Sequence, residues 1–87
     1  MTNLAIPPGE TLAEEIEARG MTQRQLASKI GRPPQAVNEL VRGKKAITAD
    51  TALALEDALE GISAKFWLNL QADYDLTLAR QRRKGSA

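Results

Sequence analysis

The stretch TQRQLASKIGRPPQAVNELVRG, residues 22–43, contains two short helical segments joined by a turn with a glycine. Thr22 and Gln25 have the spacing of a capping box, in which each side chain pairs with a backbone amide that the start of a helix leaves free. Gly31 ends the first helix, and Pro34 suits the first turn of a second helix. The segment therefore predicts a helix-turn-helix.

Small and apolar side chains support a helix-turn-helix over about residues 22–42. Ala27 is small where the two helices must approach each other, and Gly31 permits the positive φ of the turn. Val37 and Leu40 face inward and pack the second helix onto the first. An ordinary pair of antiparallel helices is the alternative interpretation.

Three further helices are expected, which makes the fold all-α with five helices. PPGE precedes the first of them, and Thr48 and Ser63 are the caps of the last two. No segment alternates between apolar and polar residues as a strand would. The expected helices outside the motif cover residues 10–19, 48–61 and 64–82, and a disordered tail is expected at residues 83–87.

Length and composition exclude several classes of protein. Eighty-seven residues, 43% hydrophobic and 26% charged, fit one domain over residues 1–87. The chain has no cysteine and no histidine, so thiolate and imidazole ligands and histidine-dependent triads are absent. Close carboxylates such as Asp73 and Asp75 point apart on a helix. We therefore expect no enzyme activity, no metal site and no cofactor.

No segment suits a membrane or secretion. The longest stretch without a charged side chain, residues 1–9, contains two prolines, whereas a membrane-spanning helix needs about 20 apolar residues. The same stretch lacks the basic start and the apolar run of a signal peptide. We expect a cytoplasmic protein with no membrane partner.

The net charge of +1 conceals a basic segment in the middle of the chain. Residues 19–45 contain seven basic side chains and one acidic side chain, whereas residues 1–18 contain four glutamates and no basic side chain. The basic segment coincides with the helix-turn-helix and indicates an anion-facing surface there, with an ordinary solvated face as the alternative.

The outer face of the second helix of the motif carries side chains that can read DNA bases. The amides of Gln35 and Asn38 match the N6 and N7 edge of adenine in a major groove. Pro34 and Glu39 complete the base-reading candidates, and Glu39 either accepts from cytosine N4 or pairs with Arg42 on the surface. Side chains expected at phosphates, with solvation as the alternative role, are Gln23, Arg24, Arg42, Lys44 and Lys45.

The C-terminal helix carries more apolar side chains than one small core can cover, so we expect it to form a homodimer. A two-fold dimer places two recognition helices about one turn of DNA apart and predicts an inverted-repeat operator in double-stranded DNA. Phe66, Trp67 and Leu70 are assigned to the monomer core. The expected dimer interface consists of Leu68, Tyr74, Leu76 and Leu78.

Four blocks of the chain resemble the XRE class of DNA-binding proteins, which includes Cro and the phage repressors, and more closely the HigA-type antitoxins. The resemblance implies a repressor that binds the operator of its own operon and neutralises a HigB-type toxin, a small ribosome-dependent mRNA endonuclease. The blocks are PPGE at 7–10, TQRQLA at 22–27, VNELVRGKKAITADTALAL at 37–55 and FWLNLQADYDL at 66–76.

The chain departs from that pattern at the head of the second helix of the motif. Pro33 and Pro34 stand where relatives usually place a serine or threonine cap and a polar residue. Two alternative functions stay open: a repressor without a toxin partner, and a small helical adaptor that uses its basic surface only for solubility. Removing the charge of Arg42 would weaken DNA binding by a regulator and leave an adaptor unaffected.

Overall fold

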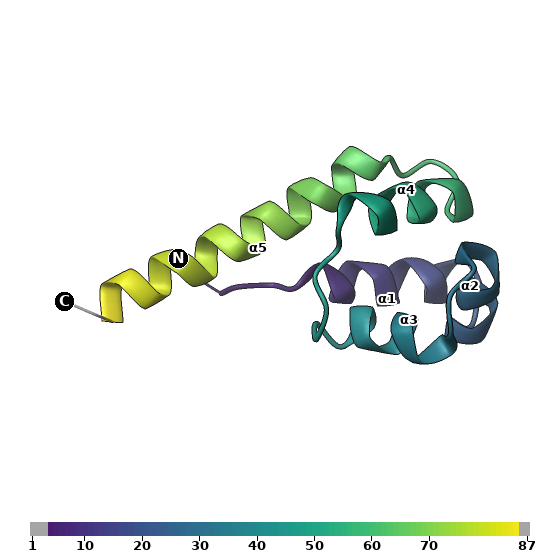
Figure 1. Ribbon diagram of the computed structural model, residues 1–87, viewed down its shortest axis with the longest axis horizontal. Coiled ribbons are helices and arrows are strands. Elements are labelled where there is room, and N and C mark those ends of the chain that lie inside the picture. Colours follow the sequence, from purple (N-terminus) through teal and green to yellow (C-terminus); the bar gives the residue numbers. More distant parts are fainter. Residues whose placement is uncertain (1–3, 86–87) are drawn as a thin grey trace.

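The computed structural model describes residues 4–85, and these residues form five helices with no strand (Figure 1). The all-α prediction is therefore confirmed. Within this part of the chain, no helix is both long and apolar enough to span a membrane. The helices are α1 (Pro8–Ala18), α2 (Gln23–Ile30), α3 (Pro34–Val41), α4 (Ala49–Ala58) and α5 (Ala64–Gly85).

Side-chain caps define the starts of three helices, as the sequence predicts. Both halves of the capping box at α2 are present: the Thr22 amide donates to Gln25 Oε1 at 2.8 Å, and the Gln25 amide donates to Thr22 Oγ1 at 3.0 Å. Thr48 Oγ1 accepts from the Thr51 amide at α4, and Ser63 Oγ accepts from the Phe66 amide at α5. The local chemistry of these residues is sufficient to place the helix starts.

Three helix boundaries differ from the expectation by two residues or more. Helix α4 ends at Ala58 and not near Gly61, because Leu59 has extended backbone angles. Helix α1 begins at Pro8, two residues early, because proline is accommodated in a first helical turn and Gly9 can continue it. Helix α5 continues to Gly85, so residues 83–85 of the expected disordered tail are helical. The last two residues of that tail, 86–87, lie outside the described residues.

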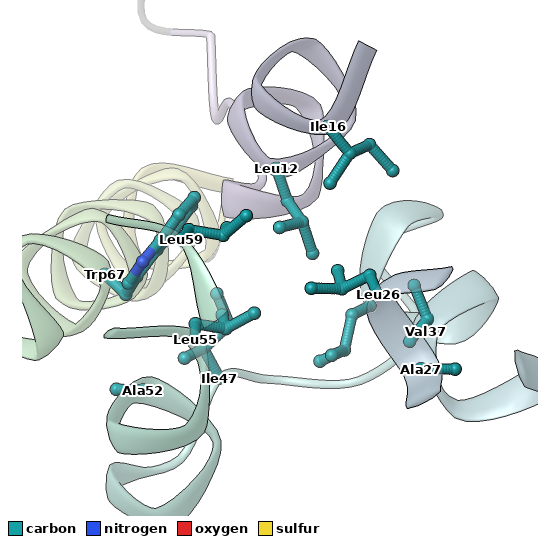
Figure 2. Packing of buried hydrophobic residues seen from close by; sticks show 11 residues of the cluster. Leu12, Ile16, Leu26, Ala27, Val37, Ile47, Ala52, Leu55, Leu59 and Trp67 are labelled. Carbon is teal, nitrogen blue, oxygen red and sulfur yellow. The ribbon is translucent and has the colours of Figure 1, made fainter. Parts of the chain in front are cut away.

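The five helices share one apolar core. Leu12 of α1, Leu26 of α2 and Val37 of α3 meet the side chains of α4 and Trp67 of α5, and Figure 2 shows the indole beside Leu59. All five of these side chains are fully buried. The first half of α5 belongs to this core, and its second half projects beyond the other helices (Figure 1).

Helix α1 packs closely against the end of α3 at Gly9, in the first turn of α1. A Cβ atom built on Gly9 would lie 2.1 Å from the carbonyl oxygen of Leu40 and 2.5 Å from that of Val41. Only a residue without a side chain permits this separation, since real Cβ contacts are essentially never below 3.0 Å. Gly9 therefore determines how closely α1 packs against α3.

Candidate nucleic-acid interface

Helices α2 and α3 form the helix-turn-helix that the sequence predicts. Gly31 adopts φ = 67° at the end of α2, the left-handed conformation that glycine accepts without steric cost. The fully buried Leu26 and Val37, with Ala27 at 1% exposure, lie between the two helices and the rest of the core. Helix α3 packs against α2 on one side and α1 on the other, and its remaining face is open to solvent.

The predicted base-reading residues lie on that open face. Pro34 and Gln35 are exposed in the first turn of α3, and Asn38 and Glu39 are half-buried one turn later. Pro33 precedes the helix with extended backbone angles and provides no side-chain cap, as its lack of a polar group requires. The start of α3 therefore presents apolar rings together with one free amide side chain, that of Gln35.

Asn38 is oriented by the neighbouring helix. Its Nδ2 donates to Oε1 of Gln23 at 3.3 Å, so the two amides lie side by side although 15 residues separate them. Gln23 is the first residue of α2 and is half-buried. The structure thus places Gln23, predicted to contact a phosphate, directly next to a predicted base reader.

Glu39 has a different partner from the one that its spacing suggests. Its Oε1 lies 3.8 Å from Nζ of Lys45, and Arg42 is not the partner. The loop after α3 turns back on the helix, because the amides of Lys44 and Lys45 both donate to the carbonyl oxygen of Glu39, at 2.9 and 3.3 Å. The ion pair is largely exposed and contributes little stability, so a nucleic acid can displace it at small cost.

Exposed basic side chains surround this face. Arg24 of α2 and three residues at and after the end of α3, namely Arg42, Lys44 and Lys45, are all exposed. Such groups bind phosphates without reading the sequence of bases. The structure therefore places cationic side chains from α2 and from the loop after α3 beside the exposed side chains of α3.

The four residues predicted to form a dimer interface lie on two faces of α5. Tyr74 and Leu78 continue the inward stripe that begins with the buried Trp67, and both are half-buried. Leu68 and Leu76 lie on the other side of the helix and are 36% and 50% exposed. Only this second pair belongs to an apolar stripe that a single chain leaves open.

Two residues that support the interface were not identified in the sequence. Arg32, in the turn before α3, donates from Nη1 to Thr51 Oγ1 and so connects the turn to α4. Gln71 of α5 accepts the amide of Ile47 in the loop between α3 and α4 at 2.8 Å. Both contacts join residues 19 or more positions apart, and no local pattern indicates them.

Comparison with known proteins agrees with this geometry. A helix-turn-helix family model matches residues 12–67. Virulence-associated protein I of Dichelobacter nodosus is 45% identical over 78 residues, which are 88% of this chain and 71% of that protein.

Two solved structures have the same fold. An addiction module antidote protein of the HigA family from Coxiella burnetii is 40% identical, with a TM-score of 0.84 over 94% of this chain and 89% of its own. The Pseudomonas aeruginosa antitoxin HigA, solved with the higBA promoter, is 32% identical, with a TM-score of 0.87 over 95% and 90%.

This chain belongs to the helix-turn-helix family and, within it, to the HigA-type antitoxins. The resemblance found in the sequence is confirmed. Its relatives include antitoxins and an HTH-type transcriptional regulator, and this membership also confirms that the chain is not an enzyme.

Proposed function

We propose that this protein is a cytoplasmic repressor that binds the operator of its own operon as a homodimer and acts as the antitoxin of a HigB-type toxin. The observation that carries DNA binding is the open face of α3, where two amides and Glu39 lie between exposed cations. The Pseudomonas aeruginosa HigA structure, solved with the higBA promoter, supports DNA binding by this chain.

The division of roles follows from the chemistry of each side chain. Gln35 and Asn38 read base edges in the major groove, Glu39 accepts from cytosine, and Pro34 contributes apolar contact. Arg24, Arg42, Lys44 and Lys45 bind phosphates, and Gln23 orients Asn38 as well as approaching the backbone. Specificity and affinity therefore reside in different residues.

Fluorescence anisotropy on the upstream duplex and on a scrambled duplex, across a salt series, tests this division. We expect at least about a thousandfold preference for the upstream duplex. Asn38→Ala should reduce that preference and leave binding to the scrambled duplex unchanged, whereas Lys44→Ala should weaken both equally. Equal, weak binding of the unmodified protein to both duplexes would refute autoregulation at this site.

Dimerisation follows from the exposed stripe on α5. Leu68, near the start of α5, and Leu76, in its second half, are large apolar side chains that are 36% and 50% exposed, and a second α5 would cover them. The two recognition helices of such a dimer would face successive major grooves of an inverted repeat. Tyr74 and Leu78 remain interface candidates at the other side of α5.

The toxin partner is the part of the proposal that rests on family membership. Co-expression with the product of the adjacent gene, followed by size-exclusion chromatography, should yield one stable complex that lacks the growth inhibition of the toxin alone. A neighbour that neither binds nor inhibits growth would leave a repressor without a toxin partner. DNA binding would be unaffected by that result.

A further inference from the structure

Helix α5 carries a buried amide, Gln71, in the stripe that faces the apolar core. The residue is 8% exposed and, with Thr51, is one of two buried polar residues among residues 4–85. Its Oε1 accepts the amide of Ile47 at 2.8 Å, and its Nε2 donates to Oδ1 of Asp75, one turn further along α5, at 2.9 Å. Both ends of the amide group are therefore occupied, which defines its orientation.

The partner of Gln71 is the loop that follows the recognition helix. The first half of this loop carries Lys44 and Lys45, and their amides are held by the carbonyl oxygen of Glu39. The second half ends at Ile47, whose side chain is 4% exposed and whose amide is held by Gln71. Each half of the loop is thus tied to a different helix, α3 or α5.

Apolar packing fixes only the Ile47 end of the loop, since that side chain is buried in the core that also contains Trp67. A cleft of about 190 Å³ lies between the loop and α5, lined by Gly43, Lys45 and Ala46 on one side and by Tyr74 and Asp75 on the other. Helix α3 itself packs mainly against α1 and α2. The hydrogen bond from Ile47 to Gln71 therefore acts together with the buried Ile47 side chain to link the DNA-facing segment to the C-terminal helix.

We infer that Gln71 is a positioning residue for DNA binding, which holds the 43–47 loop so that Lys44 and Lys45 face the phosphates. The inference rests on the proposed function. It also makes α5 part of the DNA-binding machinery: a displacement of α5 alters the placement of the two lysines. A purely structural amide would instead affect the stability of the fold and leave the DNA affinity of the folded protein unchanged.

The test compares four variants of the full chain on the upstream duplex, at a temperature where circular dichroism shows each to be folded. Gln71→Leu removes both hydrogen bonds. Gln71→Glu keeps an acceptor for Ile47 and places a carboxylate against Asp75. Gln71→Glu with Asp75→Asn reverses the second hydrogen bond and preserves the net charge. Thr77→Ala is the control, since Thr77 Oγ1 bonds only within α5, to the carbonyl oxygen of Asp73 at 2.8 Å.

We expect Gln71→Leu to weaken DNA binding about tenfold. A loss of this size corresponds to the net free energy of about one hydrogen bond. The slope of log K against log salt should become less negative by up to about 1.8 per subunit, since each lysine contact contributes about 0.9. The charge-preserving double variant should bind close to the unmodified protein and better than Gln71→Glu. Amide exchange measured by NMR should be faster at Ile47 in Gln71→Leu than in Thr77→Ala.

Three results would overturn the inference. Unchanged affinity and salt slope in folded Gln71→Leu would show that the amide is only structural. Equal losses in Gln71→Glu and in the double variant would show that restoring the net charge and the bond to residue 75 does not restore binding, which contradicts a positioning role for this amide. Absence of specific binding by the unmodified protein would remove the proposed function and this inference together, whereas normal binding by every variant removes the inference alone.

Discussion

Replacing Gly9 by alanine tests whether α1 and α3 pack as closely as the structure shows. In an ordinary helix this change is stabilising by about 0.5–1 kcal/mol, because glycine loses more backbone freedom on folding. Here the new Cβ would lie 2.1 Å from the carbonyl oxygen of Leu40. The atoms in its way are backbone atoms, so α1 must move away from α3 by roughly 1 Å to restore even the shortest normal contact.

The size of the effect follows from these two opposing contributions. Overpacking a core costs about 1–3 kcal/mol, and a clash with backbone belongs at the upper end of that range. Subtracting the helical gain leaves a loss of about 2 kcal/mol, which lowers the melting temperature of a domain of this size by about 8–16 °C. Thermal unfolding followed by circular dichroism measures the shift. Gly85→Ala is the matched control, since nothing lies within 4 Å of the added Cβ there.

The direction of the change in melting temperature of Gly9→Ala decides between the two possibilities. A variant that melts at or above the temperature of the unmodified protein would show that the close approach of α1 to Leu40 does not exist. The same displacement should move α3, so we also expect weaker binding to the upstream duplex at temperatures where the variant is folded.

Three further predictions address the interface, the dimer and a cap. Arg42→Ala should weaken binding to both specific and scrambled DNA and reduce the salt slope by about 0.9, whereas Lys65→Ala, an exposed lysine at the start of α5, should change neither. Leu76→Glu should convert the dimer to a monomer in sedimentation experiments, because a carboxylate would be buried where two α5 helices meet; a dimer that persists would place the interface elsewhere. Thr22→Ala should lower the free energy of unfolding by about 1 kcal/mol in urea titrations, through loss of the capping box; an unchanged value would show that the box does not stabilise α2.

Most of the fold follows from local chemistry, which is why the sequence predicts it well. The Thr22 and Gln25 pair, the positive φ of Gly31 and the caps at Thr48 and Ser63 all depend on residues within four positions of one another. The placement of the base-reading candidates on the outer face of α3 follows from helical periodicity alone. These features need no knowledge of what packs against them.

The partner of Glu39 differs from the one that spacing suggests, because the chain folds back on itself after α3. Spacing suggests Arg42 as the partner of Glu39, but the loop turns back and brings Lys45 there instead. Helical periodicity contains the information that Tyr74 and Leu78 continue the stripe of Trp67, whereas Leu76 lies on the opposite side. The four dimer candidates therefore divide between two faces of α5, and the interface stays a prediction.

The recognition helix is positioned by non-local contacts at both ends. Arg32 ties the turn before α3 to Thr51 of α4, and at the other end Gly9 admits α1 against the last carbonyl groups of α3. Gln71 then holds the following loop to α5. Since α3 has only eight residues, an isolated segment of this length would not remain helical in water. The orientation of α3, and with it the proposed contact of Asn38 with a base edge, is therefore imposed by the other four helices, so substitutions far from the open face should alter DNA binding without touching DNA.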